Sequence, residues 1–415
     1  MKVLLIGSGA REHALAYSLK SDKSVSELHV APGNPGIREL AELHDVNPND
    51  SESVTSLAKK LSVDLVIIGP EAPLVAGVAD SIRAVGIPCF GPSQAAAQIE
   101  GSKSFAKEIM ESAGVPTAQS FTCQSKDEIE RALDFFGSPY VVKNDGLAAG
   151  KGVVVTNERE VALKHALDCG KVVIEEYLDG PEISLFGISD GFTVRGMEPA
   201  QDFKRVFDDD QGANTGGMGA YSPLLWAPTE IIKQTEAEVL LPTIKELARR
   251  ESPFVGLLYA GLALTSRGLR VIEFNARFGD PESEVLLPRL KTPLAKLLLA
   301  AATGKLAEHP PLEWSADSAV TVVLASEGYP QEPVIGREIT GITERTDTYI
   351  FHAGTKSDSG RLLSSGGRVL AVTGIGANLE RARSHCYEAL AKITLAGSHY
   401  RKDIALKASI NEKGA

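Results

Sequence analysis

The chain has 415 residues, of which 43% are hydrophobic and 23% charged, which is the composition of a globular protein with two to three domains. Its formal net charge of −11 disfavours partners that present a phosphate backbone or an anionic membrane surface, so we expect neither a nucleic-acid nor a membrane partner. The four cysteines are too widely spaced for a zinc ribbon or a disulfide framework, and no apolar stretch reaches the ~18 residues of a membrane span; a cytoplasmic protein is therefore expected.

Residues 1–101 are predicted to form a Rossmann-like domain that binds substrate. Short apolar runs alternate there with helical patterns, which predicts a parallel sheet covered on both faces. The apolar runs are residues 3–6, 28–30, 65–68 and 88–90, and the helical patterns include residues 12–19 and 75–85. Small-residue loops follow these runs, so a ligand is expected at the carboxyl ends of the strands.

The segment from Gly7 to Glu12 follows the first predicted strand and opens a helix. Its amide groups and the positive end of the helix can bind a phosphate, with Arg11 as a clamp. A dinucleotide is a weaker interpretation, because the third glycine of the fingerprint and the acidic residue ending the second strand are missing. The alternative is that the glycines only allow the helix and strand to pack closely.

The pattern changes at residue 102, and residues 102–314 are predicted to form a two-lobed α+β module whose smaller lobe covers about residues 115–180. A long helix is predicted over residues 229–249 in the larger lobe. Residues 315–415 show short strands and glycine turns, which predict a small β-rich domain that ends in a helix over residues 378–395. The polar last dozen residues are expected to fray.

A loop with little side-chain bulk covers residues 145–152, between Lys143 and the next strand. Such a loop can lay its amides over a polyphosphate while Lys143 and Lys151 supply positive charge. It is not a Walker loop, because Gly152 follows Lys151 where serine or threonine is required. A flexible hairpin turn is the alternative, although such a turn needs no lysine at both ends.

An apolar strand over residues 173–178 contains Glu175 and ends near Leu178, and Glu182 follows it. The strand end can offer backbone groups to a purine edge, and Glu182 can accept hydrogen bonds from ribose hydroxyls. Acidic strand ends are commonly just solvated, which is the alternative.

Strand periodicity places Glu273, Asn275 and Arg277 on one face of a later strand. Carboxylate and amide oxygens suit Mg²⁺, and Arg277 beside them can clamp an anion. The alternative is a strand with one solvated face.

Residues 201–219 add charges of both signs beside a glycine-rich run, which can form an anion-binding nest. No histidine pair has a metal-ligand spacing such as H-x-x-x-H, and no G-x-S-x-G nucleophile motif occurs.

Taken in order, these segments resemble the glycinamide ribonucleotide synthetase family of ATP-grasp enzymes over nearly the whole chain. The matching segments are GSGAREHA at Gly7, PGNPG at Pro32, GPEAPLVAG at Gly69, EGSKSFAK at Glu100, VVKNDGLAAGKGV at Val141, GANTGGMGAYSP at Gly212, LLYAGL at Leu257, EFNARFGDPE at Glu273, FHAGT at Phe351 and SGGRVL at Ser365. Each segment alone is a weak indication of the family, but ten segments in the same order are specific to it.

The resemblance implies ligands for the N-terminal domain and for the two-lobed module. It implies ATP between the two lobes, bound by Lys103, Lys143, Lys151, Glu175 and Glu182 with the Leu178 backbone at the adenine, and Mg²⁺ or Mn²⁺ held by Glu273 and Asn275. It implies 5-phosphoribosylamine near Gly9, Arg11, Glu12, Asn34, Gly36 and Glu71, and a reaction centre lined by Asp202, Lys204, Arg277 and Glu282 that positions glycine. The oligomeric state stays open between a monomer and a larger assembly.

The reaction implied is activation of glycine by the γ-phosphate of ATP to glycyl phosphate, followed by attack of the phosphoribosylamine nitrogen, in purine biosynthesis. This chemistry requires positioning and charge neutralisation rather than a nucleophile. The loop at 145–152 is then a lid that excludes water. The sequence departs from the family pattern at Ala10, Phe203 and Ala213, where glycine, histidine and proline are usual, and Phe203 rules out an imidazole at that position.

Three rival functions remain open. A different ATP-grasp enzyme, acting on a later purine intermediate with carbonate or formate, would share the nucleotide and metal residues. A nucleotide-binding regulator without turnover would have no use for Glu273, Asn275 and both loop lysines together. A nicotinamide dehydrogenase would need the acidic ribose ligand that is missing.

Overall fold

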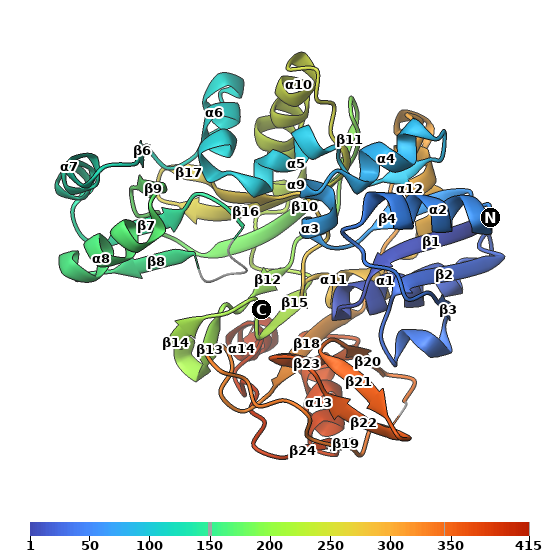
Figure 1. Cartoon of the computed structure of the whole chain (residues 1–415). Coiled ribbons are helices and arrows are strands. Elements are labelled where there is room, and N and C mark those ends of the chain that lie inside the picture. Colours follow the sequence, from blue (N-terminus) through green and yellow to red (C-terminus); the bar gives the residue numbers. More distant parts are fainter. Residues whose placement is uncertain (148–151, 344, 415) are drawn as a thin grey trace.

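The computed structural model describes residues 1–147, 152–343 and 345–414. Four sheets form the framework (Figure 1). The N-terminal sheet lies on one side of the large-lobe sheet, the smaller lobe lies on the other, and the sheet of the C-terminal segment lies below them (Figure 1). Among the described residues, no helix has the length and apolar character needed to cross a membrane.

The N-terminal segment forms the predicted parallel sheet, in the order β3-β2-β1-β4-β5. Its strands are β1 (Lys2–Gly7), β2 (Glu27–Pro32), β3 (Glu42–Leu43), β4 (Leu65–Ile68) and β5 (Cys89–Phe90), and its helices are α1 (Ala10–Ser21), η1 (Ile37–Glu39), α2 (Ser51–Leu61), α3 (Glu71–Val75) and α4 (Val78–Ala84). Val3 and Leu5 of β1 pack in the core beneath α1, while Leu4 and Ile6 pack in the core beneath α2 and α4. Burial on both faces explains the uninterrupted apolar runs.

The helix predicted over residues 75–85 is interrupted. α3 ends at Val75 and α4 begins at Val78, because Gly77 has a φ of +83°, in the left-handed region where glycine pays no steric penalty. Two helices, α5 (Gln94–Gly101) and α6 (Lys103–Ala113), then lead out of this sheet. Ser102 caps α6 by accepting a hydrogen bond from the backbone of Phe105.

The smaller lobe is an antiparallel sheet in the order β6-β9-β7-β8, covered by two helices. Its elements are β6 (Ser120–Cys123), α7 (Lys126–Phe136), β7 (Tyr140–Asn144), β8 (Val153–Thr156), α8 (Arg159–Cys169) and β9 (Val172–Glu175). Its core is small and separate, with Leu133 of α7 against Val142 and Ile174 of the sheet. This lobe is therefore a compact unit packed on the rest of the molecule.

The larger lobe contains an antiparallel sheet in the order β11-β10-β16-β17. Its strands are β10 (Glu182–Asp190), β11 (Val194–Gly196), β16 (Val255–Thr265) and β17 (Gly268–Asn275), and its helices include α9 (Ile231–Thr235), η3 (Glu236–Leu240), α10 (Leu241–Arg249) and α12 (Leu294–Ala302). The helix predicted over 229–249 is confirmed, with a π-helical turn at η3 between its two α-helical parts.

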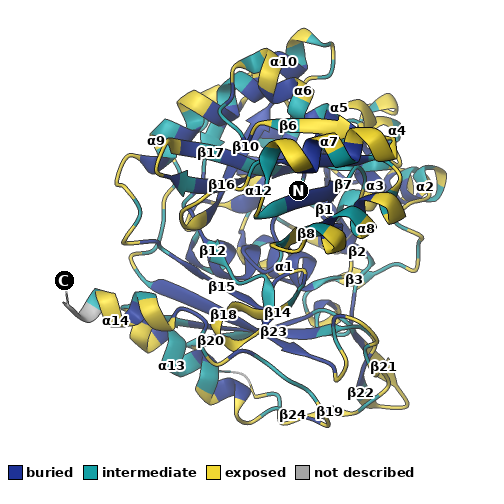
Figure 2. Ribbon diagram, turned by 90° about the vertical axis from the view of Figure 1, so that its left-hand side faces the viewer, coloured by how far each residue is buried: buried dark blue, intermediate teal, exposed yellow. Residues whose placement is uncertain are grey.

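A fourth sheet, in the order β12-β15-β18-β23-β20, joins the middle of the chain to its C-terminal segment. Its strands are β12 (Gln201–Asp202), β15 (Gly219–Ser222), β18 (Ser318–Ala325), β20 (Thr348–His352) and β23 (Arg368–Gly376). β15 pairs with β18 over four residues, so the C-terminal segment shares a continuous sheet with residues 201–222. In Figure 2 central strands such as β16 and β18 are buried, while exposed residues gather on outer helices such as α7.

Shorter elements complete the chain. They are the hairpin β13 (Arg205–Phe207) and β14 (Gln211–Asn214) around η2 (Asp208–Asp210), the turns α11 (Ser283–Leu286), η4 (Leu287–Arg289) and η5 (Leu306–Glu308), the pairs β19 (Ile339–Thr340) with β24 (Thr394–Leu395) and β21 (Thr355–Asp358) with β22 (Arg361–Ser364), and the helices α13 (Leu379–Leu390) and α14 (Leu406–Gly414). The expected fraying is wrong for residues 406–414, because α14 packs on α13 and Glu412 accepts a hydrogen bond from the Leu379 amide at 2.9 Å.

Candidate functional site

A cleft of about 1230 Å³ lies where the smaller lobe, the larger lobe and the fourth sheet meet. Most of the charged side chains predicted for the site line it. These are Arg11, Glu71, Lys103, Lys143, Glu175, Glu182, Asp202, Lys204, Glu273, Arg277 and Glu282, together with Leu178 and Asn275. The structure therefore brings together side chains from most of the segments in which the sequence predicted chemistry. Lys151 lies outside the described residues.

The floor of the cleft in the smaller lobe carries a buried charge cluster. Glu175 at the end of β9 is 3% exposed and contacts the ammonium of Lys143 on neighbouring β7 through Oε1. Its Oε2 lies 2.8 Å from Nζ of Lys107 on α6, and Lys143 also donates to the Ile272 carbonyl of β17 at 2.9 Å. Burial opposes ionisation of Glu175, but the two ammonium groups outweigh it and lower its pKa. One carboxylate against two ammonium groups leaves positive charge facing the cleft.

The start of the glycine-rich loop is fixed by Asp145. Its carboxylate accepts hydrogen bonds from both the backbone and the hydroxyl of Ser104 and lies 2.7 Å from Nζ of Lys171. Burial of Asp145 acts to raise its pKa, but the bonds from Lys171 and Ser104 lower it to about 2. Lys103 donates to the carbonyl of Gly146 at 3.0 Å, and so is held at the same loop.

The end of β17 presents the predicted metal ligands. Phe274 is buried in the core, while its neighbours Glu273 and Asn275 both line the cleft, as the strand alternation predicted. Among the described residues, neither of these two side chains has a hydrogen-bond or ion-pair partner. Two uncommitted oxygen donors beside a group of lysines fit a Mg²⁺ ion that also binds phosphate oxygens.

Arg277 is held by carboxylates from the N-terminal segment and α5. Its Nε lies 3.3 Å from Glu71 and 3.4 Å from Glu100, and its Nη1 donates to the Phe278 carbonyl at 3.1 Å. Arg11 donates to that same carbonyl at 3.1 Å. Burial acts to lower the pKa of Arg277, but Glu100 and Glu71 raise it, so this guanidinium is a fixed positive charge between the N-terminal loops and the cleft.

Asp202 of β12 lies beside Lys204, whose Nζ is 3.0 Å from Glu182. Burial raises the pKa of Asp202 to about 7, with help from Glu282 and against the opposing charge of Lys204. Glu282 is 2% exposed and accepts a hydrogen bond from the Tyr259 hydroxyl at 2.6 Å. A carboxyl group that titrates near neutrality is suited to accept a proton from an attacking amine.

The sequence matches three family models in succession. These are the phosphoribosylglycinamide synthetase N domain over residues 1–100, its ATP-grasp (A) domain over residues 101–283 and its C domain over residues 319–407. The chain belongs to the phosphoribosylglycinamide synthetase family. It is 59% identical to the phosphoribosylamine–glycine ligase of Streptomyces coelicolor over 414 residues, covering 99% of this chain and 100% of that protein. It is 54% identical to the corresponding ligase of Mycobacterium tuberculosis, with 99% of each covered.

Solved structures agree with this assignment. The phosphoribosylamine–glycine ligase of Thermotoga maritima superposes with a TM-score of 0.86 at 32% identity, over 98% of this chain and 100% of that one. The biotin carboxylase domain of Hydrogenobacter thermophilus 2-oxoglutarate carboxylase, a complex with MgADP and bicarbonate, gives a TM-score of 0.73 at 18% identity, over 96% of this chain and 91% of that one. At that identity the likeness shows a shared fold alone. The predicted ATP-grasp architecture is confirmed by the match of residues 101–283 to the ATP-grasp (A) domain of the family.

Four of the predicted substrate residues in the N-terminal loops are not among the cleft-lining residues: Gly9, Glu12, Asn34 and Gly36. Glu12 accepts hydrogen bonds from the Gly9 amide and from Nε of Arg11, both at 2.6 Å. Asn34 donates to the carbonyls of Ser8 at 2.9 Å and His352 at 2.8 Å. In the structure, Glu12 and Asn34 thus stabilise the loops through hydrogen bonds. Their contact with phosphoribosylamine stays a prediction.

Several cleft residues were missed in the sequence. Lys107 lies one helical turn after Lys103 on α6, and that i, i+4 spacing was the available signal. Arg368, from the quoted SGGRVL segment of β23, lies 2.9 Å from Asp280 and donates to the Gly216 carbonyl at 2.7 Å. The fourth sheet brings Arg368 close to residues that are distant in the chain. No local sequence pattern could therefore have predicted these contacts.

Phe203, which stands where the resemblance implied a histidine, is a packing residue here. It packs against the main core, its ring centroid lies 6.2 Å from that of Tyr221, and the Arg401 guanidinium lies over it at 4.9 Å. Its neighbours Asp202 and Lys204 still line the cleft. Asp202 and Lys204 are therefore still placed to contact a ligand in the cleft, although this segment has no imidazole.

Proposed function

We propose that this protein is a phosphoribosylamine–glycine ligase, which joins glycine to 5-phosphoribosylamine and converts ATP to ADP and phosphate in purine biosynthesis. The observation that carries the proposal is the meeting, in one cleft, of the Lys143–Glu175–Lys107 cluster with the uncommitted ligands Glu273 and Asn275. Family membership over the whole chain supports the same reaction. We place this reaction in the cytoplasm, where free cysteines such as those of this chain stay reduced.

We assign the functional units to residues 1–101 for phosphoribosylamine, 102–314 for ATP and the chemistry, and 315–415 for closure of the cleft, with the smaller lobe over about residues 115–180. The triphosphate lies between the lobes, with Lys103, Lys107 and Lys143 along it. The side chain of Glu175 positions the two lysines it contacts, and Glu182 with the backbone near Leu178 binds the nucleoside. Lys151 is proposed as a further phosphate ligand on the lid.

Glu273 and Asn275 are the residues that would hold Mg²⁺ or Mn²⁺, which neutralises phosphate charge when bound. In the first step, a glycine carboxylate oxygen attacks the γ-phosphorus, ADP leaves and glycyl phosphate forms. Arg277, fixed by Glu71 and Glu100, stabilises the anionic groups of this step. Closure of the lobes protects the acyl phosphate from water.

In the second step, the amine of phosphoribosylamine attacks the carbonyl carbon of glycyl phosphate and inorganic phosphate leaves. The amine loses one proton in forming the amide, and we assign its acceptor as Asp202, whose pKa is raised to about 7 by burial. Lys204 lies beside this carboxyl group and stabilises its ionised form. Arg11, with the loops that contain Gly9, Glu12, Asn34, Gly36 and Glu71, orients the phosphoribosyl group, and Glu282 orients glycine.

The test is ADP formation measured with each of the three substrates left out in turn. We expect ADP only when ATP, glycine and phosphoribosylamine are all present, together with a product whose mass equals that of the condensed amide. ADP formation with bicarbonate or formate in place of glycine would select another ATP-grasp reaction. ATP binding without turnover in the complete mixture would select the regulator.

A further inference from the structure

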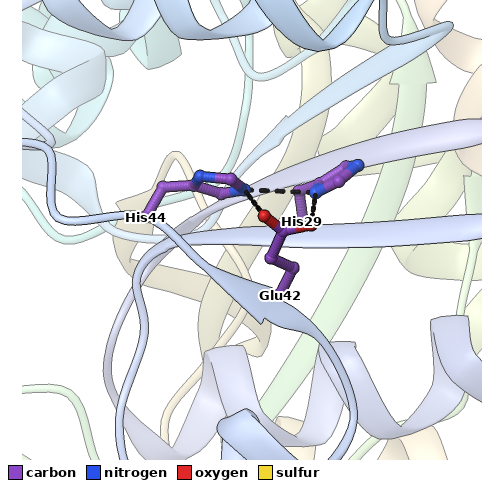
Figure 3. A group of neighbouring side chains, drawn as sticks. All are labelled: His29, Glu42 and His44. Carbon is purple, nitrogen blue, oxygen red and sulfur yellow. Dashed lines mark hydrogen bonds and ion pairs between the residues drawn. The ribbon is translucent and has the colours of Figure 1, made fainter.

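Two histidines and a glutamate meet at the edge of the N-terminal sheet (Figure 3). None of the three is among the residues that line the cleft. Nδ1 of His29 lies 3.1 Å from Nε2 of His44. Oε2 of Glu42 lies 3.5 Å from Nδ1 of His29, and its Oε1 lies 3.9 Å from Nε2 of His44. Three donor atoms of the types that bind transition metals therefore converge on one point.

The backbone fixes this arrangement. His29 on β2 is the register partner of Glu42 on β3, in a parallel pairing. His44 follows β3 two residues after Glu42, and its amide donates to the Val30 carbonyl at 2.9 Å. Because strand side chains alternate, Glu42 and His44 lie on the same side of the sheet as His29. The cluster is thus set by sheet register and not by the chance meeting of flexible side chains.

The far side of the His29 ring provides a second observation. Its Nε2 is buried and has no hydrogen-bond partner among the described residues. The carboxylate of Glu27, two residues earlier on β2, lies 3.6 Å from it. When Nδ1 of a histidine binds a metal, the proton sits on Nε2, and metal-binding histidines usually donate that proton to a carboxylate. Glu27 is placed to receive it after a small movement.

The distances suit a small divalent ion. With Zn²⁺ bonds of about 2.0–2.1 Å, two ligand atoms in a tetrahedral site are about 3.4 Å apart. The two histidine nitrogens are 3.1 Å apart, and each has a Glu42 oxygen near that distance, Oε2 at 3.5 Å from His29 and Oε1 at 3.9 Å from His44. A small shift of the Glu42 carboxylate would bring one of its oxygens into place as the third ligand. The Glu42 side chain is 67% exposed and can make this shift, and its open side leaves room for water as the fourth ligand.

We propose that His29, Glu42 and His44 bind a Zn²⁺ ion that joins β2 to the edge strand β3. β3 is only two residues long, so the ion would supply a cross-link where backbone pairing is short. Leu43 of β3 packs so closely on Gly33 that a Cβ there would lie 2.5 Å from it. The bound ion therefore also supports the loop that follows β2.

The experiment uses the untagged full chain, stripped with a chelator and titrated with Zn²⁺ by calorimetry, with thermal unfolding measured at each end point. We expect one Zn²⁺ per chain at this site and a higher unfolding temperature with Zn²⁺ than with the chelator. His44→Ala should abolish the binding. Glu42→Gln should weaken it by about tenfold or more, since even outer partners of ligands contribute about 10- to 100-fold.

Two controls remove the same groups elsewhere. Glu308 and His309 lie next to each other at the end of η5, and the Glu308→Gln and His309→Ala variants should bind Zn²⁺ like the unsubstituted protein.

The Glu27→Gln variant tests the partner of His29. It should weaken Zn²⁺ binding by about 10- to 100-fold, as expected for the acceptor of the Nε2 proton. Two results would overturn the proposal. Either the unsubstituted protein does not bind Zn²⁺ at this site, or the Glu42→Gln and His44→Ala variants bind Zn²⁺ as well as it does; the cluster would then be only a hydrogen-bonded group of side chains.

Discussion

Lys143→Met removes one ammonium group from the buried cluster while keeping most of its side-chain volume. Lys143 is 4% exposed, contacts Glu175 and donates to the Ile272 carbonyl, so its charge is fixed in the cleft with little screening by water. In the variant, Lys107 alone offsets the effect of burial on the Glu175 carboxylate, so the pKa of Glu175 rises. The cluster then presents no net positive charge to a triphosphate.

The size of the effect follows from Coulomb's law. Two unit charges about 4 Å apart at an effective dielectric of about 20 interact by about 4 kcal/mol, and desolvation offsets part of this. Loss of one partner from a buried charged contact costs about 2–5 kcal/mol. At about 1.4 kcal/mol per factor of ten, a net loss of 2–4 kcal/mol corresponds to a decrease of about 30- to 700-fold in kcat/KM for ATP.

The assay is ADP formation at varied ATP with glycine and phosphoribosylamine saturating, beside calorimetric titration with a non-hydrolysable ATP analogue. Lys164→Met is the matched control, because Lys164 is an exposed lysine on α8 of the same lobe and should keep the normal kcat/KM. Circular dichroism shows whether Lys143→Met is folded. A folded Lys143→Met protein whose kcat/KM for ATP changes by less than about threefold would refute the electrostatic reasoning.

The remaining predictions concern the metal, the proton acceptor and the loop anchor. Glu273→Gln should raise the Mg²⁺ concentration for half-maximal activity by about tenfold or more, unlike Glu308→Gln, because amide oxygens bind Mg²⁺ more weakly than carboxylates. Because Asp202 must be ionised to accept a proton and its pKa is raised to about 7, kcat/KM for phosphoribosylamine should rise with pH up to about 7 and then level off, and Asp202→Asn should lose this limb. Asp145→Asn should destabilise the protein by about 2 kcal/mol at pH 7, whereas exposed Asp168→Asn should not.

The sign of the Asp145 effect follows from its lowered pKa of about 2. The ionised carboxylate stabilises the fold above the pKa of the unfolded chain, and this contribution is lost as pH falls through the folded value. The difference between the normal protein and Asp145→Asn should therefore shrink between about pH 5 and pH 2 in urea unfolding. A constant difference would contradict the assignment, as would unchanged Mg²⁺ dependence in Glu273→Gln or an unchanged pH profile in Asp202→Asn.

Local sequence determined the elements and much of the chemistry. The apolar runs of β1 and β4 predict buried parallel strands, because only strands covered on both faces lack polar alternation. The alternation around Phe274 predicts that Glu273 and Asn275 share a surface, and both line the cleft. Such patterns depend on neighbours a few residues apart, which a single sequence contains in full. The ordered motifs then indicated the family, which the comparisons confirm.

Contacts between distant segments were decided by the tertiary structure alone. Lys107 reaches Glu175, Arg368 reaches Asp280, and His29 faces His44 although none of these pairs has a recognisable spacing. Their meeting depends on which strands become neighbours and in which register, and those pairings are stabilised by burial summed over whole sheets. The sequence by itself therefore specified which groups are chemically able to act, and the order and register of the strands decided which of them act together.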